Sequence, residues 1–347
     1  MDFSLTDDRR MLAETLDRFL ASDYPVEHRI KVAYDAPYHD PDKWAALSEL
    51  GALYALAPEE AGGMGGTGFD ISVVFEAMGR VICPEPVLGT LMAARLLSAA
   101  GEDLSELLDG SKRYAVAISE PDAPYDLDFI ECSAKDGKLS GRKTSVYGGN
   151  DADVILVACK GGSVWAVENA PVTGYGMMDG GGAAELLLDD TPGTLVLEDG
   201  RAALEDAVNA GIVALCSEAV GAMETTHAIT LDYMRQRKQF GVPIGKFQAL
   251  QHRAVDMLTE IEQARSITIK AASELGGDKA GLHASMAKEL IGRAARLIAE
   301  ESIQMHGGIA MTWEYPVSHY AKRLVMIDHQ LGDTDHHLAR VAESYAA

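Results

Sequence analysis

A short basic and aromatic segment stands out in this acidic chain as a place where chemistry is possible. The segment carries Arg235, Arg237 and Lys238, followed by Gln239, Phe240 and a Gly-Val-Pro-Ile-Gly turn. Arginine donates hydrogen bonds in a planar fork that matches phosphate, and an aromatic side chain beside it supplies an apolar wall. The segment is therefore a candidate site for an anionic ligand, although a charge run by itself is more often a solvated turn.

A second cluster of chemically capable side chains lies near the C-terminal end. It consists of His329, Asp333, Asp335, His336 and His337. Imidazole and carboxylate are metal ligands, so the cluster resembles a metal site at first sight. The Asp-Thr-Asp run is also typical of a helix start, where carboxylates cap free N–H groups and interact favourably with the helix dipole. We expect a helix cap here and no metal site.

The cysteines and the overall charge exclude several classes of protein. Cys83, Cys132, Cys159 and Cys216 show no CxxC spacing, so we expect no zinc site, no disulfide scaffold and no reactive thiol. A net charge of −23 argues against nucleic acid and anionic membranes as partners. No apolar run approaches the roughly 20 residues that span a bilayer, and the N-terminus lacks a signal-peptide pattern. We expect a cytoplasmic protein.

Helices must position most of these side chains, because apolar residues recur at helical spacing in the first hundred residues and again near the C-terminus. Stripes over 208–233, 250–267 and 282–303 predict a bundle of long helices. From about Tyr114 to Leu197 the pattern changes to short β-rich runs, too closely spaced for crossover helices, which favours an antiparallel barrel or sandwich. The predicted fold is α+β, with an N-terminal helical domain at 1–112, a middle antiparallel β domain at 113–200 and a C-terminal helical bundle at 201–347.

The basic segment resembles a motif of the acyl-CoA dehydrogenase family. The family pattern R-x-x-F-G-x-x-I-x-x-x-Q corresponds to residues 237–248. Residues 304–309, with Glu314-Tyr315-Pro316, resemble the family's Q-x-x-G-G and E-Y-P motif. Residues 58–63 resemble its P-E-E-x-G-G turn, and Ser119-Glu120-Pro121 resembles the T-E-P start of its flavin loop. The resemblance therefore spans nearly the whole chain.

The resemblance implies an oligomeric, FAD-dependent acyl-CoA dehydrogenase that passes electrons to an electron-transfer flavoprotein, with a four-helix C-terminal bundle. Arg237 and Phe240 would meet the pyrophosphate and adenosine side of an FAD whose flavin ring sits mainly in the neighbouring subunit. Glycine at 307 and 308 would allow close backbone approach. The expected cofactor-binding residues are Arg237, Gln239, Phe240, Ile244, Phe247, Leu250, Gln304, Gly307 and Gly308.

The chain departs from the family at the catalytic base. α,β-Desaturation needs an aligned carboxylate to remove the α-proton. In most members a Glu stands before Gly-Thr near the C-terminus, and the matching position here is Gly332. The alternative position used by some relatives falls at Gly211. Asp333, one position from the missing Glu, is the remaining candidate for the catalytic residue.

The flavin side of the site departs from the family as well. After Ser119-Glu120-Pro121 the usual glycine-serine-aspartate run is missing. The tryptophan and threonine that flank the flavin in relatives are replaced by Thr144 and Val146. The ADP half of the cofactor site is therefore retained in the sequence, whereas the flavin and base half is not.

Some family members are heteromers of a short subunit without the base and a longer one that carries it, as in actinobacterial steroid side-chain dehydrogenases and pimeloyl-CoA dehydrogenase. Residues 331–338 are similar to the small-subunit type. We therefore expect a subunit of a heteromeric acyl-CoA dehydrogenase, with the base in a larger partner. The open alternatives are a homo-oligomer that uses Asp333, a structural subunit that binds no flavin, and a flavin monooxygenase or nitroalkane oxidase on the same fold.

Overall fold

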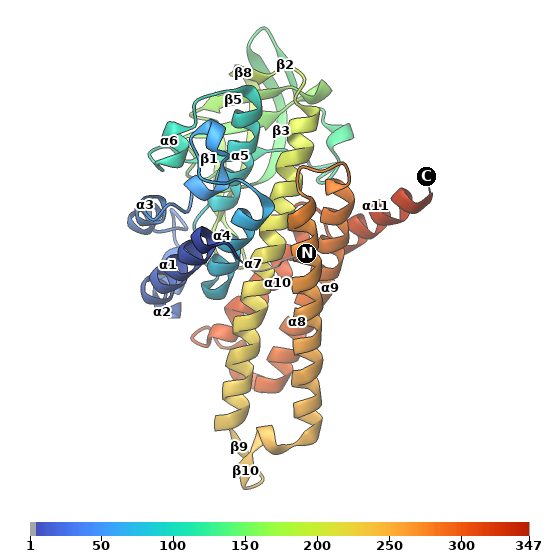
Figure 1. The fold of residues 1–347 in the computed structure, drawn as a ribbon. Coiled ribbons are helices and arrows are strands. Elements are labelled where there is room, and N and C mark those ends of the chain that lie inside the picture. Colours follow the sequence, from blue (N-terminus) through green and yellow to red (C-terminus); the bar gives the residue numbers. More distant parts are fainter. Residues whose placement is uncertain (1–4, 347) are drawn as a thin grey trace.

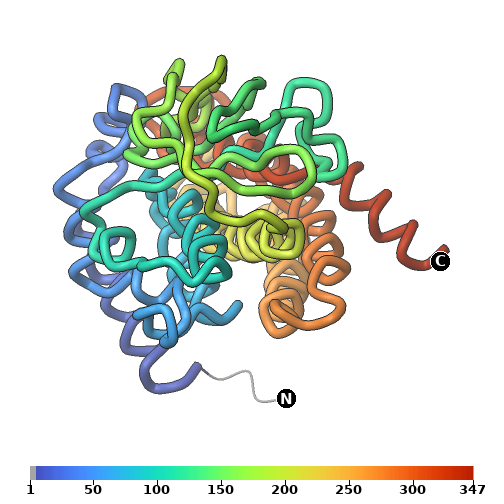
Figure 2. Tube along the Cα trace, turned by 90° about the horizontal axis from the view of Figure 1, so that it is seen from above, coloured from blue at the N-terminus to red at the C-terminus, as the bar shows by residue number. Residues whose placement is uncertain are grey.

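The structure is a computed structural model that describes residues 5–346. N-terminal helices, a β domain and a long helical bundle make up the molecule, with the β domain at the top and the bundle extending downward (Figure 1). Seen from above, the strands lie across the upper ends of the helices, and the last helix points away from the body (Figure 2).

The N-terminal part is helical, as the apolar spacing predicts. The helical spacing in the first hundred residues corresponds to the α-helices α1 to α5. A capping box between Thr67 and Asp70 starts α4, because each residue satisfies a free N–H group of the other's backbone. The elements are α1 (Asp7–Asp23), α2 (Val26–Ala33), α3 (Pro41–Glu49), α4 (Gly68–Val81), α5 (Val87–Ala100) and α6 (Ser105–Leu108), with short 3-10 turns at Tyr54–Leu56 and Glu59–Ala61.

Two four-stranded sheets form the middle domain. One has the order β1-β4-β5-β8 and the other the order β2-β3-β7-β6. All five residues of β4 are buried, so this strand lies in the core, whereas most residues of β6 are exposed. The strands are β1 (Tyr114–Ala117), β2 (Ser133–Lys135), β3 (Lys138–Tyr147), β4 (Val154–Ala158), β5 (Val164–Glu168), β6 (Val172–Gly176), β7 (Gly182–Pro192) and β8 (Thr194–Leu197).

One strand pairing corrects the expectation of a wholly antiparallel domain. β1 pairs with β4 in parallel, with Tyr114 opposite Val154 and Ala117 opposite Val157. A parallel pair needs a long connection. That connection is the whole segment between the two strands, which contains the β2–β3 hairpin of the other sheet. The prediction was wrong for this pair because it considered only strands that follow one another in the sequence. β1 and β4 are separated by two other strands, which leaves enough chain for a parallel connection.

The C-terminal part confirms the three predicted long stripes and adds a fourth bundle helix. α7, α8 and α9 follow the stripes, and α10 packs against α7 and α9. α11 contacts α9 at its start and then extends into solvent (Figures 1 and 2). The helices are α7 (Arg201–Gln236), α8 (Gln248–Glu274), α9 (Ala280–His306), α10 (Pro316–His329) and α11 (Thr334–Ala346).

Helix α7 is the core of the molecule. It has 36 residues and is apolar enough to cross a membrane by length and composition alone. However, 83% of its most apolar window is buried inside the fold, as in the core helix of a globular protein. The N-terminal helices cover one side of α7 and the bundle covers the other.

Two glycines allow α4 and α7 to cross in close contact. A Cβ atom at Gly79 of α4 would lie 2.0 Å from the carbonyl oxygen of Glu218. A Cβ atom at Gly221 of α7 would lie 2.2 Å from the carbonyl oxygen of Glu76. Backbones that approach this closely leave no room for any side chain. The crossing therefore sets how the N-terminal domain sits on the bundle.

The crossing predicts unequal effects of alanine at two helical glycines. We expect Gly221→Ala to lower the free energy of unfolding by about 1–3 kcal/mol, because the new methyl group overpacks the crossing. Gly281→Ala in α9 is the matched control, since the nearest atoms to its Cβ position are 3.8 Å away. That change is expected to be neutral or stabilising by less than about 1 kcal/mol. Urea unfolding measures the free energy of unfolding of both variants. Equal changes in this free energy would contradict the close crossing of α4 and α7.

Candidate functional site

The basic segment forms an exposed hairpin at the far end of the bundle. α7 ends at Gln236, and the N–H of Arg237 donates to the carbonyl of Tyr233 at 2.8 Å. β9 (Lys238–Gln239) and β10 (Val242–Pro243) then pair around a two-residue turn, in which Phe240 and Gly241 have φ values of +53° and +82°. Positive φ at both turn positions gives a type I′ hairpin. The turn leaves Phe240 92% exposed at the lower tip in Figure 1.

Unpaired positive charge surrounds this tip. Arg235 forms an ion pair with Asp232 at 2.7 Å. In contrast, Arg237, Lys238 and Lys246 are exposed and form no ion pair with any residue of the described range 5–346. In a chain with a net charge of −23, these cations form a local positively charged surface.

The end of α9 supplies the second arm of the site. Tyr233 of α7 stacks on His306 of α9, with ring centroids 4.5 Å apart, so the two helix ends lie side by side. Gly307 follows with φ +68° and ψ −146°, a conformation essentially restricted to glycine. Cβ atoms at Gly307 and Gly308 would meet no atom within 4 Å. This exposed backbone, next to the exposed side chain of Gln304, is open to close approach by a ligand.

The structure brings the nine expected cofactor residues to this one end of the molecule, but they are not equally available. Phe240 and Phe247 form an edge-to-face pair with centroids 6.2 Å apart, and both rings are exposed. Gln239 is exposed on the hairpin. Ile244 and Leu250 are partly buried and pack against the hydrophobic core. Free cations, an exposed ring and a glycine backbone suit the ADP part of FAD.

Asp333 and the two empty base positions lie far from the tip. α10 starts beside the second arm and carries the chain about 20 Å back along the bundle before Asp333 is reached. Asp333 starts α11, and its Oδ1 accepts a hydrogen bond from the N–H of His336 at 2.8 Å. The expectation of a helix cap at this run is therefore confirmed. Among residues 5–346, no three His, Cys, Asp or Glu side chains come together to hold a metal ion.

The two base positions, far apart in sequence, are adjacent in space and sealed. A Cβ atom at Gly211 would lie 2.6 Å from Leu331 Cδ1, so the leucine side chain covers this glycine. Gly332 has φ +107°, and a Cβ atom there would lie 2.5 Å from Nε2 of His337. A glutamate at either position would require rearrangement of its neighbours. The remaining cavity beside Leu331, also lined by Leu88 and Tyr147, measures about 20 Å³ and has no room for an acyl group.

A buried lysine holds this sealed loop in place. Lys288 of α9 is fully buried, and its Nζ donates to the carbonyls of Asp328 at 2.7 Å and Gly332 at 2.6 Å. Burial lowers the pKa of Lys288 to about 8. Burial and the neighbouring Lys288 also lower the pKa of His337 to about 3, so this imidazole is neutral. The loop that carries a base in relatives is here a packed structural turn.

The flavin side is closed in a similar way. Glu120 is buried, forms an ion pair with fully buried Lys143 at 2.8 Å, and accepts hydrogen bonds from the N–H groups of Glu131 and Cys132. Val146 is also buried. The hydroxyl of Tyr125 donates to the carbonyl of His329 at 3.2 Å, so the loop after Glu120 lies against the end of α10. Glu120, Lys143 and Val146 are therefore enclosed within the β domain.

A buried polar network that sequence reasoning missed fills the centre of the molecule. Arg323 of α10 makes two 2.6 Å bonds to Glu218 of α7 and one of 2.9 Å to Asp179. Arg29 donates to the carbonyl of Ile82 and contacts the same segment at Asp179. The sequence does contain one indication of this network. Glu218 is a carboxylate in the most apolar part of α7, and a buried charge needs a partner.

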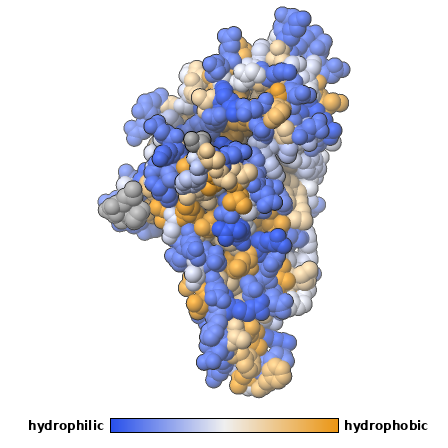
Figure 3. Space-filling model, turned by 90° about the vertical axis from the view of Figure 1, so that its right-hand side faces the viewer, coloured by the Kyte–Doolittle hydropathy of each residue, from blue (hydrophilic) through white to orange (hydrophobic). Residues whose placement is uncertain are grey.

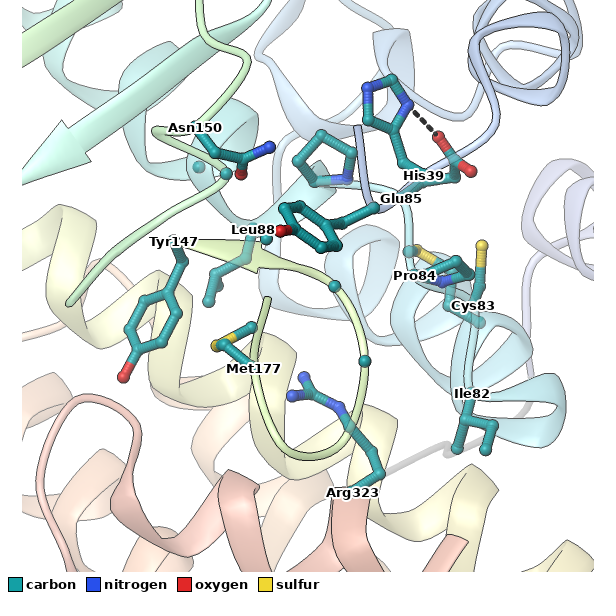
Figure 4. A pocket seen from close by; sticks show the side chains of 18 of the residues that line it. His39, Ile82, Cys83, Pro84, Glu85, Leu88, Tyr147, Asn150, Met177 and Arg323 are labelled. Carbon is teal, nitrogen blue, oxygen red and sulfur yellow. Dashed lines mark ion pairs between the residues drawn. The ribbon is translucent and has the colours of Figure 1, made fainter. Parts of the chain in front are cut away.

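Figure 4 shows the cavity that remains beside this network. It measures about 70 Å³, and Arg323, Tyr147, Asn150 and Met177 line it. His39 and Glu85 lie at one side, with Nδ1 3.2 Å from Oε2, and His39 Nε2 lies 2.8 Å from Asp151 Oδ2. This space has room for a few water molecules, not for an acyl chain.

Two family models match the N-terminal and C-terminal parts of the chain, and known proteins match nearly all of it. The model described as "Acyl-CoA dehydrogenase, N-terminal domain" matches residues 6–104, and "Acyl-CoA dehydrogenase, C-terminal domain" matches residues 198–346. The chain is similar to acyl-CoA dehydrogenase IpdE2 of Mycobacterium tuberculosis, with 33% identity over 325 residues and 91% of each chain covered.

Solved structures share the fold over their full lengths. The structure described as the "Tcur3481-Tcur3483 steroid ACAD G363A variant" has a TM-score of 0.90 and 27% identity, and the match covers 98% of this chain and 99% of the other. The ChsE4-ChsE5 complex from Mycobacterium tuberculosis has a TM-score of 0.89 with 23% identity, covering 100% and 99% of the two chains, which shows the fold alone.

The ion pairs of His39, beside this cavity, lead us to expect that the stability of the protein depends on pH. Burial opposes protonation of His39, but Glu85 and Asp151 outweigh it and raise its pKa. The free energy that protonated His39 contributes to stability is therefore fully present below the pKa of about 6.5 in the unfolded chain. It is lost as pH rises through the higher pKa of the folded protein. We expect the stability advantage of wild type over His39→Gln in urea unfolding to shrink by about 1–2 kcal/mol from about pH 6 to about pH 9. An advantage that does not change with pH would contradict a charged His39.

Proposed function

Because the chain belongs to the acyl-CoA dehydrogenase family, we propose that it is the short subunit of a heteromeric, FAD-dependent acyl-CoA dehydrogenase of the cytoplasm. In this proposal, it contributes the ADP half of a flavin site at a subunit interface, and a longer partner contributes the catalytic base and the acyl pocket. The observation that carries the proposal is the contrast between the two ends of the chain. The tip is open and cationic, whereas the base positions at Gly211 and Gly332 are sealed by packed side chains.

Each group at the tip has a role in holding the cofactor. FAD supplies the acceptor of the β-hydride in this family. The guanidinium of Arg237 would bind the pyrophosphate, Phe240 would lie against the adenosine, and Gly307 and Gly308 would let the backbone approach. These residues bind and orient. The carboxylate that removes the α-proton has to come from the partner, since none is available at position 211 or 332 in this chain.

The surface of the bundle supports assembly with a second subunit. Val255 and Leu258 on the outer face of α8 are 59% and 44% exposed, although both are apolar. Figure 3 shows apolar atoms among hydrophilic ones along the bundle and at its lower tip. Exposed apolar groups of this kind are typical of protein interfaces. Since the tip faces away from the chain's own β domain, a flavin held there needs a partner's β domain (Figure 1).

The substrate is proposed to be an acyl-CoA thioester with a bulky acyl group, because a similar structure is described as a steroid acyl-CoA dehydrogenase. Electrons would pass from the flavin to an electron-transfer flavoprotein. The sealed cavity beside Leu331 means that the acyl group would be bound by the partner.

The test is to express the chain alone and together with a longer family member encoded beside its gene. We expect FAD only in the mixed complex, at one per pair of unlike chains, because each chain alone holds half of that site. Absorbance measures flavin and native mass spectrometry measures subunit ratios. Full flavin content and turnover by the chain alone would contradict the proposal. A correctly assembled complex without flavin would instead support a purely structural subunit.

Substitution of a tip cation tests the ADP half-site directly. We expect Arg237→Ala to weaken FAD binding in the mixed complex by about 10- to 100-fold, the usual effect of losing a charged hydrogen bond to phosphate. Arg235→Ala is the matched control, because Arg235 is also exposed but is already paired with Asp232. Flavin fluorescence during titration measures both affinities. Equal losses for the two variants would show that only the general charge matters.

Asp333 distinguishes the heteromer from a homo-oligomer with its own base. Asparagine caps a helix as well as aspartate does but cannot accept a proton from carbon. We therefore expect Asp333→Asn to keep both the stability and, with the partner, the turnover of the wild type within about twofold. A loss of turnover of about 100-fold or more, with stability unchanged, would make Asp333 the base.

A further inference from the structure

Two of the four cysteines, far apart in sequence, are in contact in the fold. Cys132 Sγ and Cys159 Sγ lie 3.7 Å apart, and both side chains are buried. Cys83 and Cys216 are also free and buried. We expected no reactive thiol from the sequence and did not foresee this contact. Sequence spacing gave no signal because the two residues come from different sheets.

The two thiols lie where the sheets of the β domain meet. Cys132 immediately precedes β2, an edge strand of one sheet, and Cys159 immediately follows β4, an inner strand of the other. The N–H of Lys160 donates to the carbonyl of Cys132 at 2.7 Å, and the N–H of Cys159 donates to the carbonyl of Ser163 at 2.8 Å. Backbone hydrogen bonds thus already hold the two segments together, so a covalent link needs little movement.

The surroundings give the two sulfurs different roles. The hydrogen bond from Cys159 and the nearby charge of Lys143 outweigh burial and lower the pKa of Cys132, while the pKa of Cys159 is raised. A thiolate is the nucleophilic form of cysteine, and the neighbouring thiol is placed to attack the oxidised sulfur. The chain neighbours Glu131, Ser133 and Lys160 are exposed, so local opening of these two segments would let a small oxidant reach the sulfurs.

We propose that Cys132 and Cys159 form a reversible dithiol–disulfide modification site that is oxidised by hydroperoxides. The Cys132 thiolate attacks the hydroperoxide, its S–O bond forms as the O–O bond breaks, and the alkoxide or hydroxide leaves with one proton. The Cys159 sulfur then attacks the resulting sulfenic acid, forms the S–S bond and releases water. The two thiols lose two electrons in total, which reduce the hydroperoxide, and an external thiol restores the reduced pair.

The disulfide would couple the two sheets to the loop after Glu120. The Glu120 carboxylate accepts the N–H of Cys132 at 3.0 Å, and the same loop reaches α10 through Tyr125. A crosslink between the sheets therefore stiffens the segment that corresponds to the flavin loop of relatives. This inference concerns the β domain and does not depend on the proposed half-site at the tip.

The test treats the folded protein with hydrogen peroxide and maps its disulfides by mass spectrometry of unreduced peptides. We expect one disulfide, Cys132–Cys159, that a thiol reductant reverses, and a melting temperature several degrees higher in the oxidised form. The double variant Cys83→Ser/Cys216→Ser is the matched control and should behave in the same way. In Cys159→Ser, dimedone should trap a sulfenic acid on Cys132.

Two outcomes would overturn the proposal. One is that all four thiols of the peroxide-treated wild type can still be alkylated after unfolding. The other is that oxidation takes place first at Cys83 or Cys216, or carries Cys132 to sulfinic acid without a disulfide. Both outcomes are measured on the wild-type protein, so the proposal can be tested even if Cys159→Ser fails to fold.

Discussion

Burial of helix α7 along its length is the constraint on which the other features depend. From Ala210 to Met223 every residue of the helix is buried, so this stretch has to be removed from water on every side. The N-terminal helices cover one side through the glycine crossing at Gly79 and Gly221, and α8, α9 and α10 cover the rest. Only the end of α7 leaves this cover, and the hairpin with Phe240 therefore lies in solvent.

In the sealed half of the chain, the positions that match the family's base are packed into a structural core. Where relatives have a carboxylate, this chain has Gly211 and Gly332, covered by Leu331 and His337. Lys288 holds the loop from below, and Arg323 joins α10 to α7 through Glu218. Buried ion pairs add little net stability when compared with apolar packing, but removing one partner is costly. These charges therefore specify one arrangement of the loop and helices.

The open half of the chain is the part that the proposed assembly would use. The tip carries cations, an exposed aromatic ring and a glycine backbone, and no element within residues 5–346 covers them. In a two-fold pair of similarly folded chains, one part of the interface on each subunit contacts a different part of the same interface on its neighbour. A chain with one open end and one sealed end can therefore share a cofactor with a partner that retains the opposite half.

Much of this protein could be predicted from its sequence, because local patterns carry the information. Helical spacing predicted α7, α8 and α9, and the change to short β-rich runs predicted the middle domain. The Asp-Thr-Asp run predicted the cap at Asp333. Each of these depends on residues within a few turns of one another, where propensity, capping and side-chain type decide the outcome.

Only the tertiary structure decided which distant residues meet. The parallel pairing of β1 with β4, the contact of Cys132 with Cys159, the pairing of Arg323 with Glu218 and the cover of Leu331 over Gly211 all join segments far apart along the chain. Such contacts depend on how whole elements pack, and close packing in the interior selects one set of neighbours out of many compatible with the same local pattern.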